Sequence, residues 1–314
     1  MSNILGLLLS ATSQGLLWSL LAIGVWFTFR ILDIADLTAE GSFPLGGGIA
    51  AVGIVNGLNP VAATLLAFVG GMAAGLVTGI LNTKFKIPPL LAGIITMTGL
   101  YSITSRVMGA PNIALLGEDT LFSGVQTLGL SRNNSVILIG LLIALIAIIL
   151  LILFFRTEIG LAVRATGDNP DMSEANGIKI ENMKLLGYMI SNGCIALSGA
   201  LLAQNNGFAD LNSGVGTIVI GLASIIIAEV LLRNKPIAIR LGTIVVGAIL
   251  YRFILALVFE MNVEPSDSKL ASAIVLVICL SLPQIREKLN LNIGKSSKRE
   301  NKKGEKSNAA SLKN

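Results

Sequence analysis

The chain has 314 residues, of which 53% are hydrophobic and only 13% are charged, and its mean hydropathy is +0.79. Soluble domains carry about 25% charged residues, so this composition excludes a soluble globular protein, a disordered chain and a small disulfide-bonded scaffold. The net charge of +5 is concentrated in residues 284–314, which carry nine Lys or Arg and three acids. That distribution indicates a polar, disordered cytoplasmic tail near lipid and no nucleic-acid partner.

Uncharged runs of roughly 20 residues, the length of a helix that crosses the hydrocarbon of a bilayer, recur along the chain. They predict an all-α polytopic transmembrane bundle in residues 1–283, with about nine spans. The count becomes eight or ten if residues 30–45 are re-entrant or residues 108–133 hide a half-span. The expected spans are residues 4–29, 41–57, 60–83, 88–107, 134–155, 184–205, 214–232, 236–258 and 268–283.

Alternate connections between these spans differ in charge. Nine Lys or Arg lie in residues 84–86, 156–184 and 233–240, whereas residues 58–59, 108–133, 206–213 and 259–267 carry one, Arg132, beside six acids. Because Lys and Arg near span ends stay in the cytoplasm, this alternation predicts an N-terminus outside the cell and a C-terminus in the cytoplasm.

The first polar interruption follows the first expected span. Pro44 and the glycines at 46–48 predict that the helix is interrupted within residues 30–48. A broken helix exposes backbone N–H groups that suit an anionic group such as an amino-acid carboxylate. A cytoplasmic turn capped by Asp36 and Thr38 is the alternative. The candidate pathway residues here are Asp36, Thr38, Glu40 and Ser42.

A second interruption precedes the expected span at 214–232. Asp210, Asn212 and Ser213 lie here, and the triplet Ala-Asp-Leu at 209–211 repeats the one at 35–37. On the expected topology the two copies face opposite sides of the membrane, as in an inverted repeat whose paired interruptions mark the transport path. Chance explains three shared residues equally well.

The ionisable side chains of Glu229 and Arg252 lie within expected spans, where an isolated charge costs a few kcal/mol. Glu229 lies late in the seventh span and Arg252 within the eighth. We expect them to pair across adjacent antiparallel helices, although Arg252 could instead line a water-filled cavity. The sequence has no histidine and shows no metal-ligand spacing, so we expect no metal site.

The connection at 156–184 carries a short capped helix. Asn169-Pro170 or Asp171 suits its first turn, and Gly177 suits its C-terminal end. This helix is either a docking element or only a well-capped loop. Its candidate coupling residues are Arg164, Gly167, Asp168, Asn169, Asp171, Glu174 and Gly177.

Three segments resemble a known family. The run from Gly160 to Ile178, with Ser-Gly-Ala-Leu at 198–201, resembles the cytoplasmic coupling loop of bacterial ABC-importer permeases of the branched-chain amino acid and ribose type. Residues 30–46 and 221–229 are similar to a subgroup that occurs with lipoprotein binding proteins and has been proposed to import aromatic amino acids. The resemblance covers about residues 4–283.

The resemblance implies a multi-pass permease of the bacterial cell membrane that encloses a pathway with a second copy of itself or a paralogue. Two ATPase subunits would dock at residues 168–177, and an extracellular substrate-binding lipoprotein would deliver a small solute such as an amino acid. The sequence contains no Gly-x4-Gly-Lys-Ser/Thr phosphate loop, so we expect no cofactor on this chain, no enzyme activity and ATP on the partner. An ion-coupled secondary transporter is the alternative.

Overall fold

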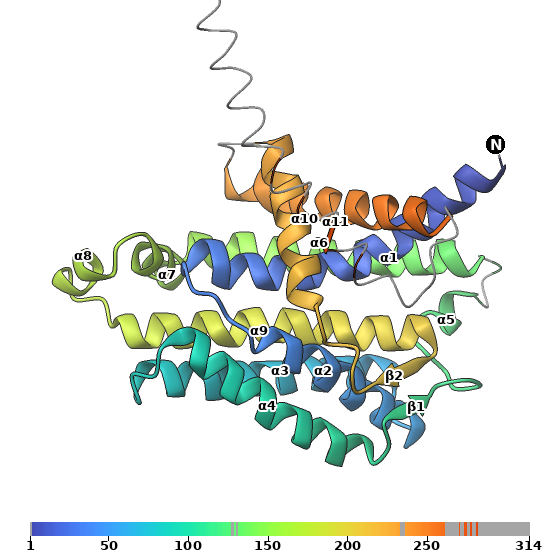
Figure 1. Cartoon of the computed structure of the whole chain (residues 1–314), viewed down its shortest axis with the longest axis horizontal. Coiled ribbons are helices and arrows are strands. Elements are labelled where there is room, and N and C mark those ends of the chain that lie inside the picture. The colour runs from blue at the N-terminus through green and yellow to red at the C-terminus, as the bar shows by residue number, and fades with distance from the viewer. Residues whose placement is uncertain are drawn as a thin grey trace, which may run out of the picture.

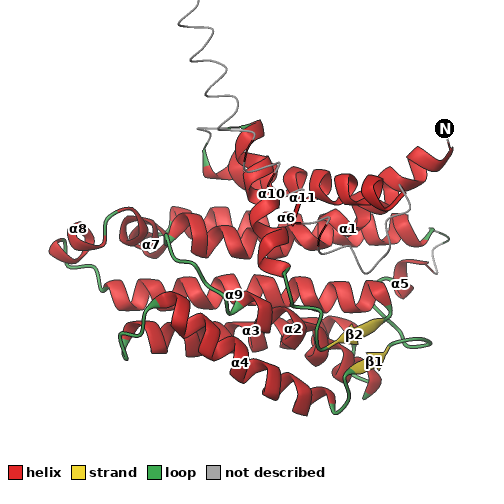
Figure 2. Ribbon diagram, viewed as in Figure 1, coloured by secondary structure: helices red, strands yellow, loops and turns green. Residues whose placement is uncertain are grey.

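The computed structural model describes residues 2–126, 129, 131–232 and 236–260, with five single positions beyond them. These residues form a helical bundle with a small two-stranded sheet at one end (Figures 1 and 2). The helices are α1 (Ser2–Trp26), the π-helix η1 (Phe27–Ile31), α2 (Ala39–Val55), α3 (Pro60–Thr83), α4 (Pro89–Met108), α5 (Ser123–Gln126), α6 (Arg132–Arg156), α7 (Glu158–Asp168), α8 (Pro170–Ala175), α9 (Ile180–Asn206), α10 (Thr217–Leu231) and α11 (Ile237–Glu260). The strands are β1 (Asn112–Ala114) and β2 (Phe208–Asp210).

The expected polytopic helical bundle is confirmed. Within the described residues, six helices are long and apolar enough to cross a membrane, namely α1 with η1, α3, α4, α6, α9 and α11. The apolar helices α2 and α10 are shorter, with 17 and 15 residues. The expected span at 268–283 and the tail at 284–314 fall outside the described residues apart from single positions, so the count of nine stays a prediction.

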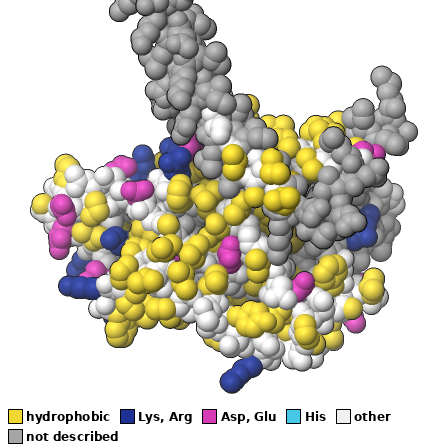
Figure 3. Space-filling view, viewed as in Figure 1, with side chains coloured by type: hydrophobic (Ala, Val, Ile, Leu, Met, Phe, Trp, Pro, Cys, Tyr) yellow, Lys and Arg dark blue, Asp and Glu magenta, His cyan; other side chains and the backbone are white. Residues whose placement is uncertain are grey.

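The two ends of the bundle differ in structure, and Figure 1 shows them at opposite ends of α9. One end carries α7 and α8, and we call it the coupling end. The other end carries β1 and β2, which pair antiparallel with Asn112 opposite Asp210, and we call it the strand end. In Figure 3 hydrophobic side chains cover much of the visible face between them, and many charged side chains gather at the coupling end.

The core of the bundle is α9, which contacts α1, α2 and α3. In its most apolar stretch of 18 residues, 72% of the residues are buried. Glycines allow the close approach of α2, as their clustering in the sequence indicates. A Cβ atom on Gly46 would overlap the backbone of Ala196, and one on Gly199 would overlap the backbone of Phe43. Backbone contact at these two points therefore fixes the position of α2 along α9.

The helices α4 and α6 lie at the periphery, and in the most apolar 18 residues of each only 28% of the residues are buried. Between residues 135 and 155 every exposed side chain of α6 is aliphatic, including Leu145, Leu150 and Leu153. Because exposed aliphatic surfaces of this size are covered by lipid or by another protein surface, this face of α6 suits contact with the bilayer. A large aromatic group on the inner side, formed by Trp26, Phe27 and Phe155, packs α6 against α1.

The close contact of α2 with α9 makes a testable prediction. Gly46→Ala should destabilise the bundle by about 1–3 kcal/mol, because the new methyl group meets a backbone that cannot move without shifting a helix. Unfolding of the purified chain by SDS titration in mixed micelles measures this loss. Gly99→Ala is the matched control, because a Cβ on Gly99 in α4 meets nothing within 4 Å. Equal stability of the two variants would contradict the prediction.

Candidate functional site

The connection from η1 to α2 enters the bundle and starts α2 in its interior. Asp36 accepts a hydrogen bond from the Asn192 side-chain amide at 2.8 Å and another from the Thr38 backbone N–H at 2.9 Å. Asn192 lies near the midpoint of α9. The first turn of α2 therefore lies about halfway along the bundle, with the Asp36 carboxylate bound to the backbone N–H of Thr38 just before it.

A buried polar network surrounds this start. Ser42 donates to the Asn192 side-chain carbonyl at 2.7 Å, and the hydroxyl groups of Thr38 and Thr78 lie 2.8 Å apart. Asp36, Thr38, Ser42, Thr78 and Asn192 are all buried. Three of the four residues predicted for this interruption thus bind one another and α3 and α9 in this conformation.

The fourth residue, Glu40, joins α2 to α10. Its Oε1 atom accepts a hydrogen bond from the backbone N–H of Gly216 at 3.0 Å, and Gly216 is the residue at which α10 begins. A Cβ atom on Gly214 would overlap the Glu40 carbonyl group. The N-termini of the two short helices therefore meet inside the bundle, and a carboxylate of α2 caps α10.

From this meeting point the two helices run in opposite directions. The last turns of α2 pack with β2 at the strand end, where Ala51 and Ile54 share a cluster with Ala209. The last turns of α10 reach the coupling end, where Glu229 binds Arg30 of η1. Opposed interrupted helices are what an inverted repeat predicts. At each helix start one backbone N–H, that of Thr38 and that of Gly216, donates to a carboxylate of the chain itself, Asp36 and Glu40 respectively.

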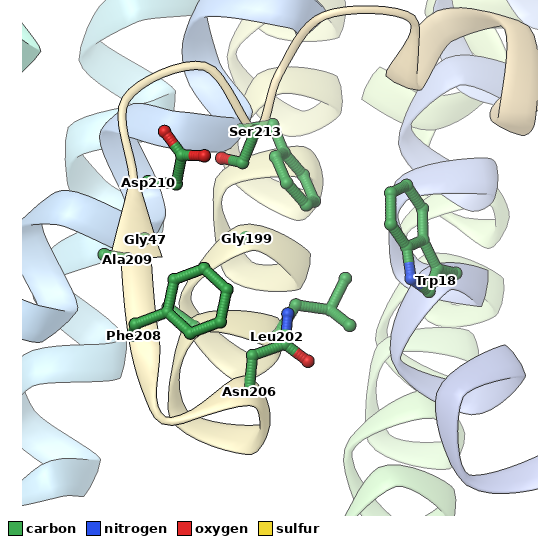
Figure 4. Close-up of a pocket in the computed structure, with 11 residues that line it drawn as sticks. Trp18, Gly47, Gly199, Leu202, Asn206, Phe208, Ala209, Asp210 and Ser213 are labelled. Atoms are coloured by element: carbon green, nitrogen blue, oxygen red, sulfur yellow. The ribbon is translucent and has the colours of Figure 1, made fainter. Parts of the chain in front are cut away.

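A small pocket lies between α1, α2, α9 and β2, on the strand-end side of this meeting point (Figure 4). Its volume is about 90 Å³. Trp18 and Phe43 stack with ring centroids 5.2 Å apart, and Figure 4 shows Phe208 of β2 across the pocket from Trp18. The glycines Gly47 and Gly199 form part of the wall, where the backbones of α2 and α9 pack closely.

Polar groups line the pocket on the β2 side. Asp210 and Ser213, both predicted as site residues, line it together with Asn206. Asn212 does not line it, and its backbone N–H donates to Asp210 at 2.8 Å. Sequence reasoning missed the aromatic residues of the pocket. The available signal was the rarity of tryptophan, because Trp18 is one of only two in the chain.

The expected pair between Glu229 and Arg252 is wrong. Glu229 binds Arg30 at 2.6 Å and Arg240 at 3.6 Å, whereas the Arg252 guanidinium lies over the Trp18 ring at 4.1 Å. The reason is the antiparallel packing of α10 on α11, which brings the end of α10 beside the start of α11. Residues 240 and 252 are twelve positions apart on α11, about 18 Å along a helix, so Arg252 lies too far toward the strand end.

The expected short helix of the 156–184 connection is confirmed as α8. Asn169 accepts a hydrogen bond from the Met172 N–H at 3.0 Å, Pro170 occupies the first turn, and Gly177 takes a positive φ of 80° just after the helix. The candidate residues Asp168, Asp171 and Glu174 are exposed, and Met172 is 64% exposed between them. The helix thus presents acidic and apolar side chains on its exposed face.

The structure adds a second helix, α7, where the sequence predicted only a loop. Thr157 caps it by accepting from the Gly160 N–H at 3.1 Å. Gly167 packs so closely on Ile31 that a Cβ atom there would overlap the Ile31 carbonyl. Because Ile31 ends η1, α7 is in backbone contact with the segment that leads to Asp36, and Arg164 lies half-buried one turn earlier.

Comparison with known proteins identifies the family. The model of the permease component of the branched-chain amino acid transport system matches residues 7–280. The chain belongs to this permease family. The permease is 42% identical over 290 residues to the tyrosine transport system permease protein of Clostridioides difficile strain R20291, covering 92% of this chain and 94% of that protein.

Other relatives are more distant. The permease is 27% identical over 250 residues to the ribose import permease protein of Bacillus subtilis strain 168, covering 79% of this chain and 75% of that protein. A chain of PsaBC from Streptococcus pneumoniae matches with a TM-score of 0.50 at 13% identity, covering 86% of this chain and 89% of that one. That likeness concerns the fold alone.

Family membership favours an ABC transporter permease over an ion-coupled secondary transporter. The chain is a multi-pass protein of the bacterial membrane, and ABC membership implies ATP use by a partner ATPase and delivery by a substrate-binding partner. The described residues contain no cluster of three or more metal-ligating side chains.

The corrected ion pair makes a testable prediction. A double-mutant cycle of Arg30→Gln and Glu229→Gln should give a coupling energy of a few tenths to about 1 kcal/mol, because both side chains are partly exposed to solvent. A cycle of Arg252→Leu and Glu229→Gln should be additive within about 0.5 kcal/mol. SDS unfolding of the purified permease measures both cycles. Coupling confined to the Arg252 cycle would contradict the structure.

Proposed function

We propose that this permease imports an aromatic amino acid, with tyrosine as the first candidate, along a path that passes the pocket of Trp18, Phe43 and Phe208. The observation that carries the proposal is the combination of three aromatic side chains with Asp210 and Ser213 in one pocket. Aromatic walls stack on an aromatic ring, and a carboxylate attracts an ammonium group. The relative named for tyrosine transport supports the same substrate class.

The size of the pocket indicates how transport proceeds. Ligand pockets usually enclose about 300–1,000 Å³, so a pocket of about 90 Å³ holds only part of such a substrate. The path must widen between α1 and the α2–α9 pair before a whole amino acid can pass. Alternating access supplies this widening in the proposed mechanism, with the opposed helices α2 and α10 as the elements that move.

The proposed coupling path begins at α8. A partner ATPase docks on the exposed face formed by Asp171, Met172 and Glu174, and its motion reaches α7. Gly167 of α7 contacts the Ile31 backbone, and the chain continues from there to Asp36 and α2. Motion of the ATPase thereby shifts the start of α2, to which α10 is attached through Glu40.

The same proposal sets the orientation and the partners. The coupling end faces the cytoplasm and the strand end faces outward, with the N-terminus outside and the C-terminus inside. A substrate-binding lipoprotein delivers its cargo at the strand end, where Asn206, Phe208 and Ser213 are exposed. A second copy of the permease, or a paralogue, completes the pathway. Loop charge and the exposed helix α8 support this arrangement.

The substrate pocket can be tested by transport. Asp210→Asn and Phe208→Leu should each lower tyrosine uptake about tenfold, because they remove the proposed ammonium partner and a stacking surface. The assay uses the assembled transporter in proteoliposomes at saturating loaded binding protein, so that the rate reports the permease step and not capture of substrate.

Glu118→Gln is the matched control, because Glu118 is an exposed acid of the strand-end connection that does not line the pocket. Substrate selectivity provides a second readout, since Phe208→Leu should reduce tyrosine uptake more than leucine uptake. Unchanged tyrosine rates in both pocket variants would rule out the proposed path.

Docking at α8 can be tested by co-purification. Reversing the charges of Asp171 and Glu174 to arginine should reduce recovery of the ATPase with the permease about tenfold, while the permease still inserts in the membrane. Glu118→Arg at the strand end is the control for a change of surface charge. Recovery of the ATPase at the wild-type level would exclude α8 as the docking element.

A further inference from the structure

A second pocket lies at the coupling end, away from the aromatic pocket and separate from α8. It is formed between α6, α7 and the start of α11 and encloses about 410 Å³. One arginine comes from each helix, namely Arg156, Arg164 and Arg240, and apolar side chains such as Ile152, Phe155 and Ile237 form the remaining wall. No acidic side chain lines it among the described residues.

The charge of this arginine pocket is largely uncompensated. Arg156 and Arg164 form no salt bridge with any residue that the structure describes. Arg240 lies 3.6 Å from Glu229, but the shorter contact of Glu229 is to Arg30 at 2.6 Å. The pocket therefore holds about two positive charges in excess. Guanidinium groups that converge from three helices suit the several oxygen atoms of a phosphate group.

The surroundings of the pocket indicate what carries that phosphate. The pocket lies at the end of α6, whose outer face is aliphatic and suits contact with the bilayer, with Leu150 and Leu153 61% and 54% exposed just before it. Ile239 at the start of α11 is also exposed. A charged pocket that continues into a lipid-facing apolar surface matches a molecule with an anionic headgroup and acyl chains.

We propose that the arginine pocket binds the headgroup of an anionic phospholipid, with the acyl chains along the outer face of α6. The phosphodiester accepts hydrogen bonds from Arg156 and Arg164, and Arg240 closes the site from α11. The bound lipid holds α7 between α6 and α11, next to the contact of Gly167 with Ile31. This site is independent of the proposed substrate, because no residue lines both pockets.

Native mass spectrometry of the assembled transporter in detergent tests the proposal. Phosphatidylglycerol should be retained about tenfold better than phosphatidylcholine, and Arg156→Gln with Arg164→Gln should remove most of this preference. Lys84→Gln with Lys86→Gln is the matched control, because it removes two exposed cations near the same end that do not line the pocket. Equal retention of phosphatidylglycerol by the wild type and the arginine variant would overturn the proposal.

Two further measurements distinguish a lipid site from a site for free phosphate and from a contact surface for the ATPase. Glycerol phosphate at millimolar concentration should not displace phosphatidylglycerol, and complete displacement would show a site for free phosphate instead of lipid. Removal of the ATPase subunit should leave lipid retention unchanged. Retention that appears only without the ATPase would show that the pocket belongs to the protein interface, and would also overturn the proposal.

A single substitution keeps the test valid if the double variant does not fold. Arg164→Gln alone should reduce the thermal stabilisation that phosphatidylglycerol gives to the permease, because the stabilisation by a bound lipid increases with its affinity. In this variant the melting temperature without added lipid should change less than the rise in melting temperature that phosphatidylglycerol produces. An undiminished increment in Arg164→Gln would overturn the role of this arginine and the proposed site.

Discussion

A helix that begins inside an apolar bundle needs hydrogen-bond partners for its first backbone N–H groups, because neither water nor lipid can supply them there. Two short helices of this permease meet part of that requirement with carboxylates of the chain itself. Asp36, held by Asn192 of α9, accepts from the backbone N–H of Thr38 just before α2, and Glu40 of α2 accepts from that of Gly216 just before α10. Backbone carbonyls accept from the next N–H groups, as the Thr38 carbonyl does from Gly41 and Ser42. The starts of α2 and α10 therefore depend on each other, because a movement of α2 also moves Glu40, the hydrogen-bond partner of Gly216.

This dependence gives the fold a mechanical connection between its ends. The glycine contacts of α2 with α9 bring backbones together without intervening side chains, so in the proposed mechanism rigid helices and not flexible side chains transmit the motion. On one side of the meeting point lies the aromatic pocket, and on the other Glu229 ties α10 to Arg30 and Arg240. The same two helices thus connect the proposed substrate path with the coupling end.

The two pockets differ in charge. At the strand end the pocket combines aromatic rings with Asp210, and Arg252 lies against Trp18 without entering an ion pair among the described residues. At the coupling end, three arginines line the pocket proposed for lipid, while the acids of α8 are exposed. Separate surfaces for substrate, lipid and ATPase can therefore coexist on one small chain.

The sequence by itself determined the class of protein, the long apolar helices, the interruptions before α2 and α10, and the caps of α8, because these depend on local composition and on residues a few positions apart. It missed α7 and the strands, which are short and are stabilised by contacts with distant segments. It also assigned Glu229 to the wrong arginine, because spacing along two apolar helices does not reveal which turns lie opposite each other. Only the tertiary structure decided that Asp36 meets Asn192, that Glu40 caps α10 and that Trp18 faces Phe208, since packing of helix backbones sets the register between segments that are far apart in the chain.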